Sequence, residues 1–207
     1  DFNAMYVKSD YNNMIAQGQY HNPIVPIYLF PPADDIRKYE IYERYDPDRR
    51  IPDQFWPFGN QGLQMQNPYW ITHAQSNRQK IDRYMLSAVA RYKLMDWLDI
   101  TGRVRIDNSA IKGEIKRPAG TDGLFASRLG FYTLSQTSMK STYADIIASV
   151  RHKLSSTLQF NINAGASFVN EKSELTEAGG NLSNLANFYA IENTRSFPLT
   201  NFGPIIP

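Results

Sequence analysis

The chain contains no cysteine, so neither a disulfide framework nor a thiolate ligand or nucleophile is available to it. It has no apolar run of about 18 residues, which excludes a transmembrane helix. Residues 1–20 lack the basic start and the apolar core of a secretory signal. The net charge of +2 is small and the basic residues are scattered, so we expect no nucleic-acid partner. Aromatic side chains, in contrast, are abundant, with 13 Tyr and 11 Phe.

Residues typical of catalytic or metal sites are not arranged in a recognisable motif. His21, His73 and His152 lie far apart in the sequence and none belongs to a ligand spacing such as H-x-x-x-H. Six carboxylates cluster between residues 34 and 48, but without the order of a calcium-binding loop. We therefore expect no enzyme activity, no cofactor and no bound metal.

The chain divides into three regions by pattern. Residues 1–77 show no sustained period but carry many aromatics, which predicts an ordered, extended loop region. Within it, Ile27–Phe30 is typical of a short strand and Ile36–Tyr45 of one or two helical turns. Residues 78–175 alternate between apolar and polar side chains. Residues 176–207 return to irregular chain, in which we interpret Gly179-Gly180 as a turn.

The alternation in residues 78–175 has a period of two, which predicts extended strands with one apolar and one polar face. Four strands are expected, at residues 83–94, 97–107, 143–154 and 157–168. Met95-Asp96 and Ser155-Ser156 are expected to join them into two hairpins, and residues 112–140 to connect the hairpins. Short turns would then lie at one end of the sheet and long loops at the other.

The same alternation assigns residues to the two faces of the sheet. The apolar face is expected to include Leu86, Ala88, Ile100, Val104, Ile146, Val150, Phe160 and Ile162. The polar face is expected to include Arg91, Arg103, Arg105, Asn161 and Asn163. Its arginines, with Arg151, would either bind an anion or pair with carboxylates such as Asp99, Asp107 and Asp145, and we favour pairing.

Two architectures satisfy this pattern. A soluble sandwich keeps charges off its inner face, and a membrane barrel keeps them off its lipid-facing side. The strand lengths, of about a dozen residues, and the aromatics near the strand ends are typical of a barrel. The pattern by itself leaves both architectures open.

Aromatic residues of the first region are candidates for contacting a substrate or a lid protein. They are Tyr42, Tyr45, Trp56, Phe58, Tyr69 and Trp70. Aromatic side chains also stiffen long loops by packing on one another, and for any single residue we favour this interpretation.

Six segments, in this order, resemble the barrel region of SusC/RagA-like TonB-dependent transporters. They are "MIAQGQYHNPIVPIYLFP" (14–31), "YERYDP" (42–47), "FWPFGNQGLQMQNPYW" (55–70), "DRYMLSAVARYKLMDWLDITGRVRID" (82–107), "TYADIIASV" (142–150) and "GASFVNEKSELTEAGGNL" (165–182). The resemblance implies an all-β fold: an antiparallel, up-and-down transmembrane β-barrel segment with short periplasmic turns and long extracellular loops. Four strands cannot close such a barrel, so the chain would be part of a larger one, with its apolar face against the lipid bilayer.

The resemblance also implies a function. The chain would belong to a transporter in the outer membrane of a Gram-negative bacterium, importing oligosaccharides or peptides with a SusD-like surface lipoprotein. The TonB complex would act through parts outside this chain. Two alternatives remain open: a soluble, secreted β-sandwich that binds glycans, and a different outer-membrane barrel such as a passive porin or adhesin.

Overall fold

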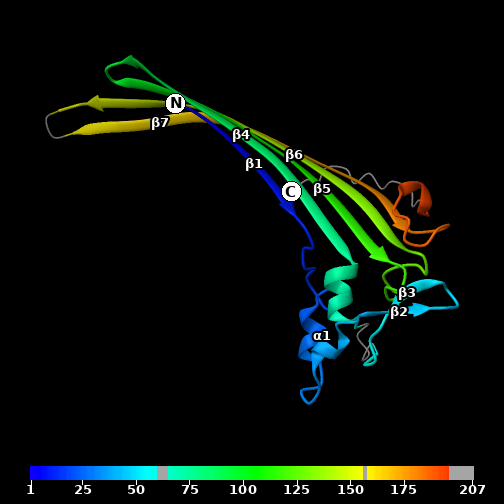
Figure 1. Cartoon of the computed structure of the whole chain (residues 1–207). Helices are drawn as coiled ribbons and strands as arrows, with labels where there is room; N and C mark the ends of the chain where they lie inside the picture. Colours follow the sequence, from blue (N-terminus) through cyan, green and yellow to red (C-terminus); the bar gives the residue numbers. More distant parts are fainter. Residues whose placement is uncertain (60–64, 156–157, 196–207) are drawn as a thin grey trace.

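The computed structural model describes residues 1–59, 65–155 and 158–195, which form one long, twisted sheet with a loop region at one end (Figure 1). The sheet has five antiparallel strands in the order β1-β4-β5-β6-β7, and a separate hairpin pairs β2 with β3. The strands are β1 (Phe2–Tyr11), β2 (Glu43–Asp46), β3 (Ile51–Gln54), β4 (Ser76–Met95), β5 (Leu98–Pro118), β6 (Gly130–Lys153) and β7 (Gln159–Asn181). Because neighbours in the large sheet follow chain order, it is an up-and-down meander.

The expected antiparallel all-β fold is confirmed, and so is the order of the four expected strands. Each strand is longer than the alternation predicted, with 20 to 24 residues. The expected connection at residues 112–140 is wrong over most of its length, because β5 runs to Pro118 and β6 starts at Gly130. Polar residues occupy both faces there, so the period of two disappears while the backbone pairing continues.

The first strand of the sheet lies within the region that we expected to consist of loops. β1 pairs with β4 from Phe2 opposite Ala88 to Tyr11 opposite Gln79. Met5 and Val7 alternate with Ala4 and Tyr6, so both faces of β1 carry apolar side chains in residues 4–7 and no period of two is visible. Pairing with β4, rather than the local pattern, decides this strand.

Three local predictions differ from the structure. Ile27–Phe30 is not a strand, because α1 (Ile24–Tyr28) occupies most of it. In Ile36–Tyr45, a 3-10 turn (Ile36–Tyr39) is followed by the start of β2. Gly179 and Gly180 lie inside β7 with positive φ angles, not in a turn.

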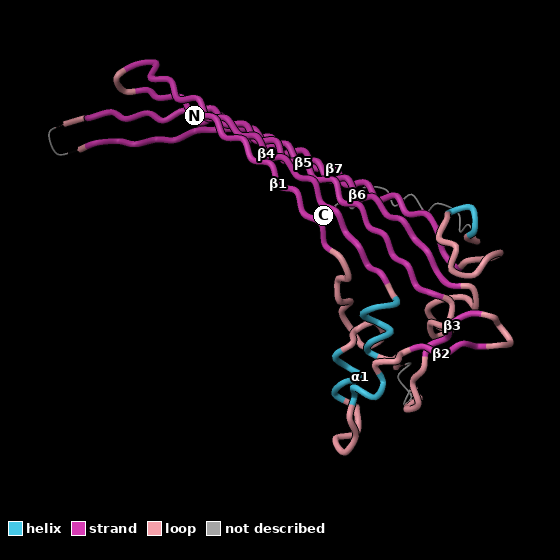
Figure 2. The backbone as a smooth tube through the Cα atoms, viewed as in Figure 1, coloured by secondary structure: helices cyan, strands magenta, loops and turns pink. Residues whose placement is uncertain are grey.

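Short turns and long loops lie at opposite ends of the sheet, as predicted (Figure 2). Asp96 and Trp97 form the turn between β4 and β5, one residue later than expected. The turn expected at Ser155-Ser156 lies partly outside the described residues, which omit 156–157. Residues 12–59, 65–75, 119–129 and 182–195 gather at the other end, termed here the loop end. No helix in the described ranges is long and apolar enough to cross a membrane.

The buried core lies at the loop end and not across the sheet. Its hydrophobic members are Met65, Trp70, Ile71, Ala119, Ala126, Tyr132 and Leu182. Apolar side chains of the sheet itself stay open to the surroundings, with Ile146 at 54% exposure and Ile162 at 59%. In the described part of the chain, therefore, no second layer covers the apolar face.

Candidate functional site

All eight residues that were expected to share an apolar face do so. Strand register places Ala88 opposite Val104, Ile100 opposite Ala148, and Val150 opposite Ile162. β1 adds Phe2, Ala4 and Tyr6 to this face, because they stand opposite Ala88, Leu86 and Tyr84. We call the following residues the apolar band: Phe2, Ala4 and Tyr6; the even-numbered residues of 84–94, 98–106, 144–150 and 160–168.

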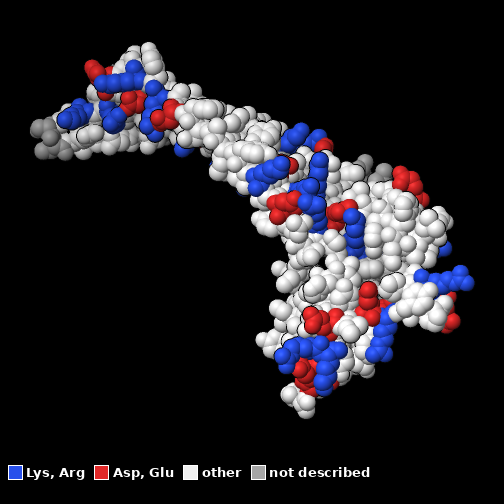
Figure 3. Space-filling view, viewed as in Figure 1, with Lys and Arg blue, Asp and Glu red and all other residues white. Residues whose placement is uncertain are grey.

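The apolar band contains no charged residue, and it ends within the sheet. Toward the loop end, the same face continues with charged residues. They include Lys8, Asp10, Lys80, Asp82, Lys112, Glu114, Lys140, Lys172 and Glu174. Figure 3 shows an uncharged stretch between the charges at the turn end and those half-way along the sheet.

The border of the band is slanted across the strands. Toward the loop end, the last apolar residue is Tyr84 on β4 and Ile106 on β5. Tyr84 stands opposite Asn108, which lies two residues nearer the loop end than Ile106. Ile106 stands opposite Thr142, again two residues beyond Ala144, the last apolar residue on β6. Ala144 is level with Phe168 on β7. The border thus shifts by four residues over three strand neighbours.

The polar face carries ion pairs between strands. Arg103 on β5 contacts Asp145 on β6, which stands directly opposite, with nitrogen–oxygen distances of 2.9–3.0 Å. Arg83 donates to Asp107 at 2.9 and 2.5 Å, and Arg151 pairs with Asp99. The preference for pairing over a free basic patch is confirmed for Arg103 and Arg151.

The remaining residues expected on the polar face also lie there. Arg91 is 3.9 Å from the Asp1 carboxylate. Asn161 stands opposite Arg151, and Asn163 stands opposite Ser149. Arg105 lies between Ser87 and Tyr143 and has no ion pair among the described residues.

The polar face is also where the sheet is hollowed. One hollow is lined by Arg91, Asp99, Thr101, Arg151, Asn161 and Asn163, among others. A second lies beside Ser87, Arg103, Arg105 and Tyr143. Nearly all side chains that line these hollows have odd numbers, which identify the polar face. The polar face therefore supplies most of the residues that line these hollows.

Two buried amides organise the loop region. Asn67 is fully buried and donates from Nδ2 to the backbone carbonyls of Tyr39 at 3.0 Å and Phe55 at 2.9 Å. Its Oδ1 accepts from the backbone N–H of Tyr69 at 2.8 Å. Gln66, also fully buried, donates to the Tyr20 carbonyl and accepts from Gln75. These hydrogen bonds hold several turns of irregular chain together, as backbone hydrogen bonds do in regular secondary structure.

Most of the candidate aromatic residues pack on other rings. Trp56 and Phe58 form a cluster with Phe30 and Tyr39, with ring centroids 4.9–6.2 Å apart. Tyr42 lies against Trp70 and His73, and Tyr69 stacks on His73. Trp70 is only 1% exposed and donates to Thr121, so it is a core residue. Tyr45, on the β2–β3 hairpin, is 66% exposed.

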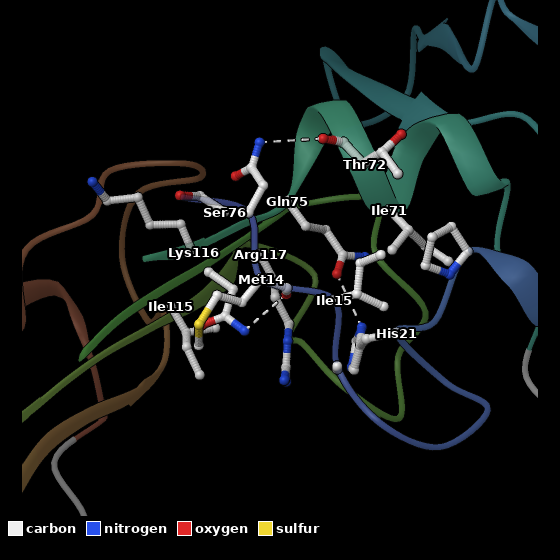
Figure 4. Close-up of a pocket in the computed structure, with 14 residues that line it drawn as sticks. Met14, Ile15, His21, Ile71, Thr72, Gln75, Ser76, Ile115, Lys116 and Arg117 are labelled. Atoms are coloured by element: carbon white, nitrogen blue, oxygen red, sulfur yellow. Dashed lines mark hydrogen bonds between the residues drawn. The ribbon is translucent and has the colours of Figure 1, made fainter. Parts of the chain in front are cut away.

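A cavity of about 140 Å³ lies where the loop region meets β4 and β5 (Figure 4). His21 and Gln75 line it, with His21 Nδ1 2.9 Å from Gln75 Oε1. Gln75 already donates through its amide to Gln66, so its oxygen accepts from His21. Burial and, to a smaller extent, the nearby charge of Arg117 together lower the pKa of His21 to about 4, against the opposing effect of the Gln75 hydrogen bond. His21 is therefore neutral at physiological pH.

Two members of the acidic cluster, Asp34 and Asp35, pair with basic neighbours. Hydrogen bonds from Lys38, then Tyr39 and the Asp35 backbone, lower the pKa of Asp34 to about 2. Asp35 accepts a bidentate pair from Arg37. Among the described residues, no group of three or more His, Asp or Glu side chains is arranged to hold a metal ion.

Sequence reasoning did not identify Gln66, Asn67 or Asn193 as organising residues. Asn193 is 4% exposed, donates to the carbonyls of Leu185 and Phe188, and accepts from two backbone N–H groups. A buried amide in an irregular stretch belongs to no periodic pattern that would predict its role. Its partners are backbone groups, which every residue has, so the partners give no signal in the sequence either.

Neither a protein-family model nor a curated protein matches the chain.

Proposed function

We propose that this chain is part of the wall of a transmembrane β-barrel, in an outer-membrane transporter of the SusC/RagA-like TonB-dependent kind. The apolar band would face lipid, the polar face would line the lumen, and the loop end would be extracellular. In this arrangement the edge strands β1 and β7 pair with further strands of the barrel, since an open sheet edge would leave backbone N–H and C=O groups without hydrogen-bond partners.

The apolar band is the observation that carries the proposal. On β4 it runs from Tyr84 to Leu94 and on β7 from Phe160 to Phe168, spans of 11 and nine residues. A tilted transmembrane strand needs about 9–11 residues. A soluble sandwich would bury such a face against a second sheet, yet Ile146 and Ile162 are more than half exposed.

The slanted border supports the same proposal. Strands lie about 4.8 Å apart and rise about 3.3 Å per residue. A flat membrane surface that crosses strands tilted by about 35–45° therefore shifts by roughly 1 to 1.5 residues per strand. The observed shift of four residues over three neighbours, from Tyr84 to Phe168, agrees with this expectation.

The proposed activity is import of an oligosaccharide or a peptide, and it rests on the sequence resemblance. A SusD-like lipoprotein would meet the loop end, where Tyr45 and the apolar side chains of α1 are exposed. The TonB complex would act from the periplasmic side, through parts outside this chain. The chain's own residues would bind and guide the substrate without a covalent step.

Two neighbouring substitutions test the membrane assignment in the full-length protein. Ala148→Arg places a charge in the apolar band, and Ser149→Arg places the same charge on the polar face, opposite Asp99. Arg at the membrane midplane costs about 2–4 kcal/mol. We expect Ala148→Arg to reduce the folded protein in the outer-membrane fraction, measured as the band that shifts on boiling. Ser149→Arg should stay close to wild type.

A soluble wild-type protein with no heat-dependent shift would contradict the proposal. Retention of that soluble protein on a glycan column, lost on substitution of Tyr45, would instead support the glycan-binding alternative. A heat-shifting protein that diffuses solutes without TonB would favour a passive porin.

A further inference from the structure

We propose that the lysines just beyond the border of the apolar band bind phosphate groups of anionic lipid headgroups, in the leaflet on the loop side of the membrane. This inference rests on the proposed function. It concerns four residues of the charged region on the outward face: Lys80, Lys112, Lys140 and Lys172.

Strand register sets these lysines in two like-charged pairs. Lys80 on β4 stands directly opposite Lys112 on β5, and Lys140 on β6 stands directly opposite Lys172 on β7. Side chains in such pairs start about 5 Å apart, and like charges at that spacing destabilise a sheet. Two such pairs on one face are therefore places where an added anion would relieve repulsion.

Carboxylates lie near these lysines, but they are engaged by other groups or shared. Asp10 stands directly opposite Lys80, and its carboxylate pairs with Arg78. Glu174 is close enough to both Lys172 and Lys140 for each to lower its pKa. Lys172 pairs with Glu174 at 2.5 Å, whereas Lys80, Lys112 and Lys140 have no ion pair in the described ranges. The arginines of the polar face behave differently, since Arg83, Arg103 and Arg151 each contact an aspartate. All four lysines are exposed, so their ammonium groups can reach an external anion.

Three of the four lysines lie just above the expected headgroup layer, within reach of a lysine side chain. Lys80, Lys140 and Lys172 each lie four residues beyond the last apolar residue of their strand, and Lys112 lies six beyond Ile106. Four residues of a strand tilted by about 45° correspond to roughly 9 Å of height. Headgroups occupy about 5–7 Å above the hydrocarbon, and a lysine side chain bends down to reach them.

Phosphate suits this arrangement because two ammonium groups can share one of its oxygens or contact two of them. Basic residues near an anionic membrane surface attract such headgroups, and each contributes roughly fivefold to the affinity. The paired geometry favours a phosphate held between lysines over a diffuse attraction to the surface.

The test compares variants of the full-length protein purified in a zwitterionic detergent. Lys140→Gln with Lys172→Gln removes one pair, and Lys80→Gln with Lys112→Gln removes the other. Lys93→Gln with Lys153→Gln removes the same charge at the turn end and serves as the control. Binding of diphosphoryl lipid A is measured by native mass spectrometry, with dephosphorylated lipid A and inorganic phosphate as comparison ligands.

We expect each pair variant to bind diphosphoryl lipid A at least fivefold more weakly than wild type, while the control binds like wild type. Dephosphorylated lipid A should not distinguish the proteins. Equal affinity of all variants would overturn the inference, and so would full competition by millimolar inorganic phosphate, which would indicate a site for the free anion. The heat-dependent shift, recorded on the same samples, separates the two proposals: if it persists while the lysines have no effect, only the lipid site fails.

Discussion

Arg103 and Asp145 stand directly opposite each other on β5 and β6, and Arg103 Nε lies 3.0 Å from both carboxylate oxygens. The Asp145 side chain is 4% exposed and that of Arg103 is 47% exposed. Tyr143 donates a further hydrogen bond to the same carboxylate. One half-exposed arginine thus meets a covered carboxylate on the polar face of the sheet.

Exchanging the two charges tests whether the attraction between Arg103 and Asp145 stabilises the sheet. Asp145→Arg alone should destabilise the sheet, because it sets two arginines opposite each other. Combining it with Arg103→Asp should recover part of the loss. Each single substitution opposes two like charges, whereas the double variant restores one attraction, so we expect the double variant to lose less stability than the sum of the two single losses. The measurement is the temperature of the heat-dependent gel shift in the full-length protein, and simple additivity of the two substitutions would contradict the expectation.

Asn67→Ala should loosen the loop region. Removing its amide leaves the carbonyls of Tyr39 and Phe55 without these donors in a buried position. An unsatisfied buried group costs about 1–3 kcal/mol. We expect faster proteolytic cleavage within residues 12–75 and an unchanged sheet. Asn184→Ala, at an exposed side chain, is the control, and equal cleavage rates in the two variants would argue against the assigned role.

The stability of the loop region should depend on pH through His21. Its pKa is about 4 in the folded protein and near 6.5 when exposed. The unfolded state therefore binds the proton first as pH falls, so stability decreases from about pH 6.5 to about pH 4 and levels off below. Hydrogen exchange of residues 65–75, corrected for intrinsic rates, measures this change. His21→Gln should abolish that component, whereas His73→Gln, at an exposed ring, should retain it.

Gly179→Ala should disturb the loop end of β7. Gly179 has a φ of +127°, and an added Cβ would overlap the Tyr132 carbonyl oxygen and lie 2.8 Å from Thr133 Cα. Backbone strain of this kind costs about 1–3 kcal/mol, before the overlap is relieved. We expect a lower temperature of the heat-dependent shift. Gly123→Ala meets nothing within 4 Å and should be neutral, and a similar loss in both variants would count against the steric explanation.

The sequence by itself determined the parts of the sheet where one face is apolar. In Leu98–Ile106 and Phe160–Phe168 every second residue is uncharged and mostly apolar, so the local pattern specifies both the strand and its face. It also indicated that arginines such as Arg103 would find carboxylates, because both kinds of residue alternate on the same face of neighbouring strands.

Only the tertiary structure decided the rest. Both faces of β1 carry apolar side chains, and both faces of β5 and β6 carry polar side chains toward the loop end, so pairing with neighbouring strands defines these segments. The loop end depends on Asn67 and Asn193, which donate to backbone carbonyls such as those of Phe55 and Phe188. No periodic pattern in the sequence marks these partners. The slanted border and the opposed lysines likewise depend on register, which relates residues on different strands and leaves no mark within any single segment.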